Sequence, residues 1–229
     1  TVCIFFPTWP LLSVFGVSLG VFTMILGIVM ALVQDDLKRL LAYSSVSQMG
    51  YVLAGIGLGT YLGCFGGLFH LLNHALYKSL LFMCVGAVIY ATGVRKISQL
   101  GGLARKMPVT SACFIVGALA ISGMPPLNGF MSKLTIFLAL ARSGLWWAAA
   151  LAVVTGLLTM VVLVRTARDV FWAAPACDPA TAMDVRAVPA TMTVPMILLA
   201  AACVALGILP QAVFPVLDKA AAVLATFGR

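Results

Sequence analysis

Six runs of about 20 apolar residues, separated by charged or turn-forming stretches, constrain this chain more than any other feature, because about 20 such residues cross a bilayer as a helix. Hydrophobic residues make up 63% of the sequence and charged residues only 9%. In lipid, a spanning segment must satisfy its own backbone hydrogen bonds, as a helix does. We therefore predict an all-α, polytopic transmembrane bundle of about six spanning helices, one of them broken at mid-membrane.

The predicted spans lie in a single membrane domain that covers residues 1–229. They are roughly 11–33, 39–59, 66–91, 109–141 (the broken one), 145–167 and 190–210. Residues 213–227 are too few to cross a bilayer and are expected to lie along a surface. The connection between the second and third spans is expected to be short and flexible because it is rich in glycine: Gly55, Gly57, Gly59, Gly63, Gly66 and Gly67.

Nearly all of the chain is therefore placed in the membrane, and this excludes several functions. No soluble domain is large enough for a flavin, a nucleotide or an iron–sulfur cluster, and the sequence contains no Gly-rich phosphate loop or CxxC pair. The six cysteines are scattered and are interpreted as small packing residues. We expect no cofactor, no metal and no catalytic residue, so any redox chemistry belongs to a partner.

The net charge of +8 does not indicate a nucleic-acid partner, because the basic residues flank the predicted spans. If the loops after the first, third and fifth spans share one side, nine basic residues lie there: Lys38, Arg39, Arg95, Lys96, Arg105, Lys106, Arg165, Arg168 and Arg186. Only Arg142, Lys219 and Arg229 lie on the other side. The positive-inside rule then places these odd-numbered loops in the cytoplasm of a multi-pass protein of the inner (plasma) membrane.

The third span carries both histidines of the chain and one lysine at four-residue spacing, His70, His74 and Lys78. This spacing places the three side chains on one helix face. A lysine inside a span is disfavoured by about 2.5–3.5 kcal/mol on insertion scales, so it should face protein or water. Such a lysine by default indicates a functional site; the alternative is a hydrogen-bonded cluster between helices with no role in transport.

The second span has a polar stripe on an otherwise apolar helix. Ser44 and Gln48 are four residues apart, as are Ser47 and Tyr51, which gives two neighbouring polar rows. Either Asp35 or Asp36, just before this span, is suited to cap its N-terminus. The stripe is predicted either to line water or simply to allow close helix packing.

The fourth span contains two prolines between two glycines: Gly123, Pro125, Pro126 and Gly129. Such a segment cannot continue a regular helix, and non-helical backbone at this depth must be buried in protein or line a water-filled cavity. Lys133 is expected in the first turn of the helix that restarts, where the helix dipole and the loss of water disfavour a permanent positive charge. We predict that Lys133 can gain and lose a proton, the alternative being a lysine that extends from the broken helix toward water.

Intramembrane carboxylates are not expected. The chain has no Glu, and its six aspartates lie near span ends or in connections. Proton carriers inside the membrane must then be Lys or His, with help from Tyr, Ser and water. A metal or haem at the His70/His74 pair is a further alternative, but no acid or thiolate lies nearby in the sequence.

Three separated motifs resemble the antiporter-like, proton-pumping membrane subunits of respiratory complex I. The same family includes subunits of energy-converting hydrogenases, of formate hydrogenlyase and of multisubunit sodium/proton antiporters. The motifs are Asp36-Leu-Lys-Arg-Leu-Leu-Ala-Tyr-Ser-Ser-Val-Ser-Gln-Met-Gly50, His70-Leu-Leu-Asn-His-Ala-Leu-Tyr-Lys-Ser-Leu-Leu-Phe82, and Gly101-Gly-Leu-Ala-Arg-Lys-Met-Pro108 followed by Ser122-Gly-Met-Pro-Pro-Leu-Asn-Gly-Phe-Met-Ser-Lys133.

This resemblance implies two inverted five-helix repeats, each with one broken helix, joined by a hydrophilic axis. Lys78 matches the connecting lysine of the family, with His70 and His74 in its relay, and Lys133 matches the broken-helix residue of the second half-channel. Residues of about 11–167 correspond to this second repeat, followed by the helix at 190–210. The first repeat is absent, so the chain is interpreted as a fragment or a split subunit.

The function implied by the resemblance is that of a transport subunit of an oxidoreductase, either a complex I-like NADH:quinone oxidoreductase or a membrane-bound hydrogenase. Its expected partners are the lipid bilayer and other membrane subunits, including one that supplies the first repeat. Two alternatives stay open: a subunit of a sodium/proton antiporter without a redox partner, and a structural half-subunit that does not conduct.

Overall fold

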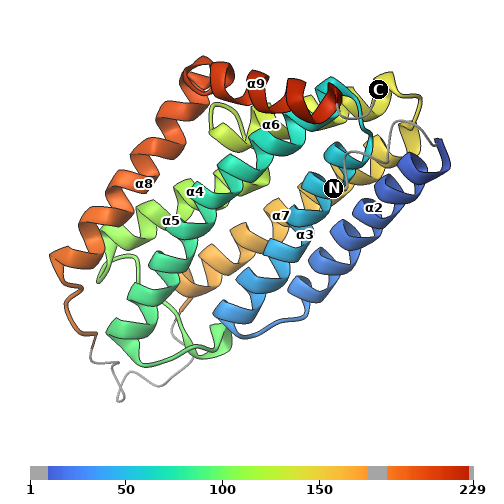
Figure 1. The fold of residues 1–229 in the computed structure, drawn as a ribbon. Helices are drawn as coiled ribbons and strands as arrows, with labels where there is room; N and C mark the ends of the chain where they lie inside the picture. Colours follow the sequence, from blue (N-terminus) through green and yellow to red (C-terminus); the bar gives the residue numbers. More distant parts are fainter. Residues whose placement is uncertain (1–9, 175–184, 227–229) are drawn as a thin grey trace.

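The computed structural model describes residues 10–174 and 185–226, and the regular elements of this part of the chain are all helices, without strands. Its α-helices are α2 (Pro10–Leu32), α3 (Leu37–Gly57), α4 (Tyr61–Thr92), α5 (Pro108–Ser122), α6 (Asn128–Arg142), α7 (Trp146–Ala167), α8 (Ala190–Ile208) and α9 (Phe214–Thr226). Shorter turns are η1 (Ile97–Gln99), η2 (Arg168–Trp172), which continues α7, and η4 (Pro210–Ala212). Figure 1 shows the long helices side by side, with α9 lying across one end.

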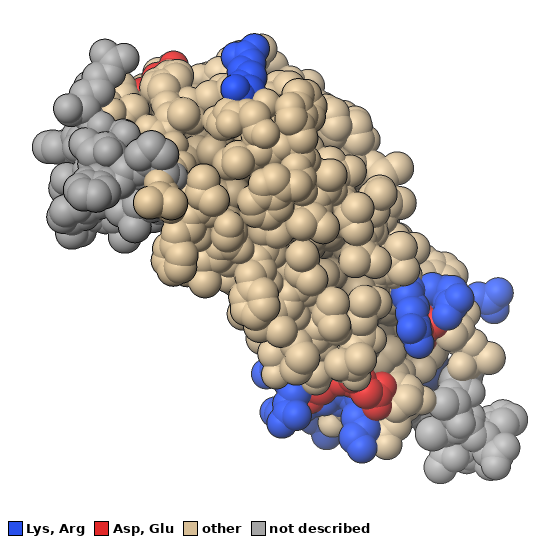
Figure 2. Space-filling view, turned by 90° about the vertical axis from the view of Figure 1, so that its right-hand side faces the viewer, with Lys and Arg blue, Asp and Glu red and all other residues tan. Residues whose placement is uncertain are grey.

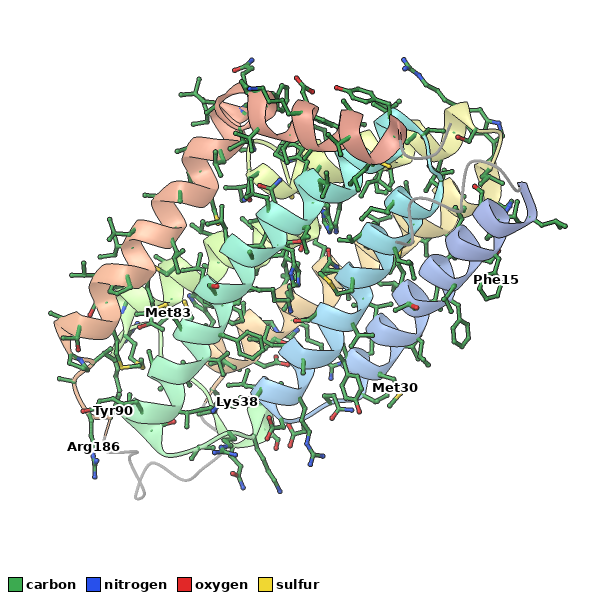
Figure 3. The ribbon with its side chains drawn as sticks, viewed as in Figure 1. Phe15, Met30, Lys38, Met83, Tyr90 and Arg186 are labelled. Atoms are coloured by element: carbon green, nitrogen blue, oxygen red, sulfur yellow. The ribbon has the colours of Figure 1, made fainter. Side chains whose placement is uncertain are left out.

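The predicted fold class is confirmed. Four helical segments of the described residues are long and apolar enough to cross a membrane: Ser13–Leu32, Tyr61–Thr92, Trp146–Trp172 and Ala190–Ile208. The more polar α3 runs beside them, and the α5–α6 pair occupies the place of the predicted broken span (Figure 1). Large apolar side chains remain exposed on the flanks of this bundle, such as Phe15 on α2, which is 62% exposed and points outward in Figure 3. Such a surface suits lipid.

Small residues let α2 and α3 pack with their backbones almost in contact. A Cβ atom built on Gly20 would lie 2.6 Å from the backbone nitrogen of Ala54, and one built on Gly27 would lie 2.5 Å from that of Ser47. Gly50 on α3 has the same restriction from the carbonyl oxygen of Gly20. This seam fixes how α3 faces the rest of the bundle, and α3 carries the polar stripe.

The predicted glycine-rich connection between the second and third spans is wrong in its extent. Gly55 and Gly57 lie within α3, whereas Gly63, Gly66 and Gly67 lie within α4, which begins at Tyr61. Only Gly59 lies in the turn, with a positive φ of 66°. A Cβ atom on Gly55 would meet the carbonyl oxygen of Gly63 at 3.0 Å, so these glycines allow two helices to cross closely rather than loosening the chain.

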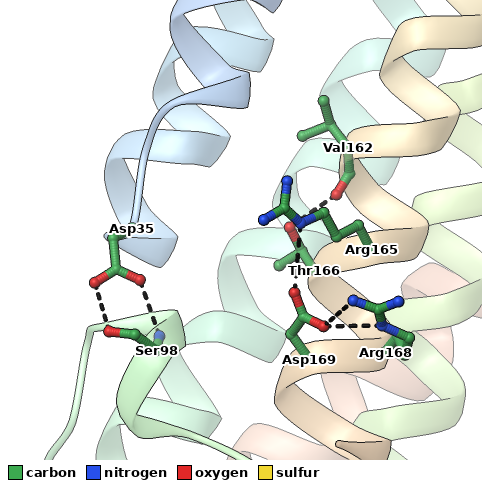
Figure 4. A network of polar contacts seen from close by, with 7 residues as sticks. All are labelled: Asp35, Ser98, Val162, Arg165, Thr166, Arg168 and Asp169. Carbon is green, nitrogen blue, oxygen red and sulfur yellow. Dashed lines mark hydrogen bonds and ion pairs between the residues drawn. The ribbon is translucent and has the colours of Figure 1, made fainter.

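The two aspartates before α3 have different roles. Asp36 caps the helix, because its carboxylate accepts hydrogen bonds from the backbone nitrogens of Lys38 and Arg39 at 2.8 and 3.0 Å. Asp35 instead accepts from the backbone nitrogen and the hydroxyl of Ser98 at 2.9 and 2.7 Å, as Figure 4 shows. The loop between α2 and α3 is thereby held against η1.

Helix α9 lies along the end of the bundle, as predicted for residues 213–227. Its buried residues Leu217 and Ala221 join a cluster with Cys64, Phe65 and Phe69 of α4. The hydroxyl of Tyr61 also donates to the carboxylate of Asp218 at 2.7 Å. Of the six cysteines, Cys64, Cys84, Cys113 and Cys203 are buried, and Cys3 and Cys177 lie outside the described residues.

On the face shown in Figure 2, charged side chains gather at the two ends of the bundle and are absent from the middle of the described residues. The nine basic residues predicted to share a side lie in the first turn of α3, between α4 and α5, and between the last turn of α7 and the start of α8. Lys38 and Arg186, labelled in Figure 3, both lie near the same end of the bundle. We call it the basic end.

Candidate functional site

Lys78 of α4 is buried against α3, with 5% of its surface exposed. Its Nζ atom donates hydrogen bonds to the carbonyl oxygen of Leu41 at 2.7 Å and to the hydroxyl of Ser44 at 2.6 Å. The ring of Phe82 lies 5.9 Å from the same nitrogen. The lysine thus faces protein rather than lipid, as the sequence predicts.

His70, two turns earlier on the same helix, connects three helices. Its Nδ1 atom lies 3.0 Å from the hydroxyl of Ser132 on α6, and its Nε2 atom lies 3.2 Å from Oε1 of Gln48 on α3. The hydroxyl of Tyr77 is a third neighbour, 3.4 Å from Nε2. All four side chains are fully buried. Imidazole can hold or release a proton at either nitrogen, so this arrangement suits proton transfer between α3 and α6.

His74 lies between these two residues on α4 but differs from them. It is half-buried, and its Nε2 atom is buried without a hydrogen-bond partner in the described part of the protein. The Nε2 atom of Gln48 is also without a partner there. Buried polar atoms of this kind commonly bind internal water. Lys78 thus bonds to α3, and His70 contacts α3, α6 and Tyr77 of its own helix; no hydrogen bond of the described residues links either side chain to His74.

The predicted helix break is confirmed. α5 ends at Ser122, Gly123 follows with a φ of 80°, and α6 begins at Asn128, with a cis peptide bond between Pro125 and Pro126. A Cβ atom on Gly129 would collide with the carbonyl oxygen of Ala120, so only glycine permits this approach of the two half-helices.

Two asparagines hold the break to α4, a feature that the sequence analysis missed. The side-chain nitrogen of Asn73 donates to the backbone oxygen of Asn128 at 3.1 Å, and the side-chain nitrogen of Asn128 donates to Oδ1 of Asn73 at 3.1 Å. Both side chains are fully buried. Asn73 lies between the two histidines in the sequence. An asparagine inside an apolar span is itself a sign of a polar contact with another helix, and this sign could have identified the residue.

Lys133 is 3% exposed, and its position differs from the prediction in one respect. It is the sixth residue of α6, in the second turn rather than the first. Its Nζ atom reaches back to α5, where it donates to the carbonyl oxygen of Ile121 at 2.8 Å and lies 3.5 Å from that of Ser122. Carbonyl oxygens at a helix C-terminus carry partial negative charge and attract a cation.

Tyr51 of α3 lies between the histidine and this lysine. Its ring centroid is 5.5 Å from that of His70 and 4.8 Å from Nζ of Lys133. Its hydroxyl donates to the carbonyl oxygen of Ala152 on α7 at 2.6 Å. The aromatic face supplies a further favourable contact for an ammonium group.

The polar stripe of α3 divides between two faces. Ser44, Gln48 and Tyr51 point toward the buried lysines and His70, whereas the hydroxyl of Ser47 donates to the carbonyl oxygen of Met24 on α2 at 2.8 Å. The structure therefore brings together Lys78, His70, Lys133, Ser44, Gln48 and Tyr51 on one interior surface, and Ser47 stays at the α2 seam. The sequence analysis missed Ser132, which lies next to Lys133 and carries the contact from His70 into the broken helix.

Carboxylates do not reach this interior in the described residues. The aspartates at 35, 36, 169 and 218 are not among the buried polar side chains, and no three His, Cys, Asp or Glu side chains of the described residues gather in a way that could hold a metal ion. The interior polar groups are amines, imidazoles, amides and hydroxyls.

These features define a multi-pass membrane protein with a broken helix and two lysines inside its bundle. The chain belongs to the NADH:quinone oxidoreductase/Mrp antiporter transmembrane family, whose model matches residues 1–159.

Named relatives agree with this assignment. The chain is 37% identical over 211 residues to NADH-quinone oxidoreductase subunit N of Desulforudis audaxviator, covering 88% of this chain and 42% of that protein. It is 36% identical over 223 residues to formate hydrogenlyase subunit 3 of Escherichia coli, covering 88% and 36%. Its fold matches a chain of the Mrp complex from Dietzia sp. with a TM-score of 0.86 and 27% identity, covering 93% and 47%. The chain thus spans less than half the length of these relatives.

Proposed function

We propose that this chain is a proton-translocating membrane subunit of a redox-driven complex, of the complex I or membrane-bound hydrogenase type. The observation that carries the proposal is the pair of lysines inside the bundle, 5% and 3% exposed, with polar side chains of three helices between them. A permanent charge inside the bundle is costly in free energy. A lysine at this position is therefore best explained by a function, and an amine that gains and loses a proton can carry protons.

The proposed relay begins at Lys78. A proton passes from Lys78 to Ser44 and then, through water held beside His74 and Gln48, to His70, whose Nε2 atom is positioned by the side-chain oxygen of Gln48. From His70 it reaches Ser132 and then Lys133 at the break. Like charges inside the bundle repel, so the relay requires that a proton on one lysine disfavours a second proton on the other. A redox-driven change in a partner subunit supplies the bias.

The experiment is proton pumping by membrane vesicles that contain the intact complex, measured with a pH-sensitive dye. Lys78→Ala and Lys133→Ala should each abolish or sharply reduce pumping while the complex stays assembled, as checked by the amounts of the partner subunits. Lys96→Ala, at an exposed position of the basic end, is the control and should pump normally. Normal pumping by both interior variants would refute the relay and support a structural half-subunit that does not conduct.

A sodium/proton antiporter subunit is the second candidate, because the chain also matches the Mrp fold. The absence of interior carboxylates among the described residues favours protons, since a hard cation prefers oxygen ligands with negative charge. Pumping that requires sodium, and that continues without an electron donor, would identify the antiporter.

The proposed partners are other membrane subunits, including one that supplies the first repeat. Solved relatives support this, since they are chains of multisubunit membrane assemblies such as complex I from Thermus thermophilus. We further propose an inner (plasma) membrane location with the basic end in the cytoplasm, which follows from the positive-inside rule. Co-purification identifies the partners, and labelling of a cysteine introduced at Ser98 in intact cells and in inverted vesicles tests the orientation.

A further inference from the structure

A second feature lies outside the bundle interior, where α5 and the α7–η2 segment leave an apolar groove of about 280 Å³. Ile115, Ala118 and Leu119 of α5 form one wall, and Val164 of α7 lies on the other. Arg168 and Trp172 line the same groove at the end of α7. None of these residues takes part in the proposed relay.

The groove begins at the level of the membrane surface. The α7–η2 segment is a candidate span from Trp146 to Trp172, and tryptophans lie at both of its ends. Trp146 and Trp147 are 70% and 46% exposed at one end, and Trp172 is 52% exposed at the other. Because exposed tryptophans favour the lipid–water interface, Trp172 marks this level, and the groove continues from it toward the hydrocarbon layer.

Positive charge surrounds this end of the groove. The Arg168 guanidinium donates to one oxygen of Asp169 at 2.9 and 2.7 Å, as Figure 4 shows, yet its side chain is still 69% exposed and open to a second anion. The backbone nitrogen of Ala104 donates to the carbonyl oxygen of Phe171 at 2.9 Å, which holds the loop carrying the exposed Arg105 next to η2. At the basic end, nine basic residues outnumber Asp35, Asp36 and Asp169 among the described residues.

We propose that this groove binds one anionic phospholipid. The acyl chain lies along Ile115, Leu119 and Val164, the phosphate contacts Arg168, and the ring of Trp172 packs at the junction of head group and chain. An apolar slot with a guanidinium at its interfacial end matches an amphiphile with a single negative head.

The test uses Trp172 as a local probe in the full chain. Trp9, Trp146 and Trp147 are replaced by Phe, and the protein is placed in phosphatidylcholine vesicles that contain increasing fractions of brominated phosphatidylglycerol or brominated phosphatidylcholine, which quench nearby tryptophan. We expect brominated phosphatidylglycerol to reach half-maximal quenching at a lipid fraction about fivefold lower than brominated phosphatidylcholine does. This is the preference expected for one basic residue near a membrane surface.

Variants at the arginine separate head-group recognition from general lipid contact. Arg168→Gln should remove the preference, and Arg168→Lys should keep most of it because the positive charge remains. Arg186→Gln, which removes an exposed charge of the same end outside the groove, is the matched control and should leave the preference unchanged.

Three results would overturn the proposal. Equal quenching by the two lipids would mean that the groove contacts bulk lipid only, and an unchanged preference in Arg168→Gln would mean that another site holds the head group. If neither lipid quenched Trp172, protein rather than lipid would cover the groove. Failure of the proton relay would affect none of these readings, because the assay does not measure transport.

Discussion

The Nζ atom of Lys133 lies 2.8 Å from the backbone carbonyl oxygen of Ile121, so the side chain of the second half-helix closes the end of the first. Ile121 is in the last turn of α5, where carbonyl oxygens lack partners within the helix. The lysine thus satisfies a buried backbone acceptor at the helix end as well as placing an amine at the break. A change of protonation or position at Lys133 would therefore act on the contact between α5 and α6.

Replacement of Lys133 by Arg separates these two roles. Arginine retains a donor for the Ile121 carbonyl oxygen but stays protonated under all physiological conditions. In Lys133→Arg, we expect assembly to be retained and pumping to fall to the background of uncoupled vesicles, measured by dye quenching at equal subunit content. Pumping near the wild-type rate would mean that the position needs a cation and not an exchangeable proton.

The close approach of the two half-helices predicts a strong effect of one methyl group. Gly129→Ala places a Cβ atom against the Ala120 carbonyl oxygen and must displace α6, together with Lys133. We expect a lower thermal midpoint in detergent and a loss of most pumping activity. Gly86→Ala, on α4, is the matched control, because its Cβ meets, among the described residues beyond the neighbouring backbone of α4, only Cε of Met192, at 4.0 Å. Equal behaviour of the two variants would contradict the packing argument.

The capping contact of Asp36 gives a prediction about stability alone. Asp36→Ala removes the acceptor for two backbone nitrogens of α3 and should lower the free energy of unfolding by about 0.5–2 kcal/mol. Asp36→Asn keeps a capping oxygen and should cost much less. Thermal unfolding in detergent, followed by circular dichroism, measures both. The cap is unimportant if the alanine and asparagine variants melt at the same temperature as the wild type.

The sequence was sufficient for features that depend on composition and local patterns. Apolar runs predicted the helices to within a few residues at α2 and α7, and the two prolines with two flanking glycines predicted the break. The four-residue spacing placed Lys78 and His70 in the interior. Such features follow from helix periodicity and from the cost of a polar group in lipid, both of which act within one segment.

Features that depend on how two helices pack against each other could not be predicted from the sequence. Nothing in the α3 sequence distinguishes Ser47, which faces Met24, from Ser44, which faces Lys78, because the rotation of a helix is set by its neighbours. Gly63 and Gly67 looked like a flexible connection, since glycine at a close helix crossing has the same local sequence as glycine in a turn. The sequence likewise gives no sign that the side chain of Lys133 reaches back to the carbonyl oxygen of Ile121 on α5.

The unequal contacts of the two histidines give the last prediction. His70 bridges Gln48 and Ser132, so His70→Ala removes the link between α3 and α6 and leaves two buried polar groups short of a partner. The loss should cost about 1–3 kcal/mol of stability and abolish most pumping. His74→Ala removes a ring whose Nε2 makes no hydrogen bond in the described residues, so its stability should change less and its pumping should fall only partly. Parallel measurement of pumping and thermal midpoint decides between the routes: a larger loss in His74→Ala would mean that protons travel along α4 itself and not across α3.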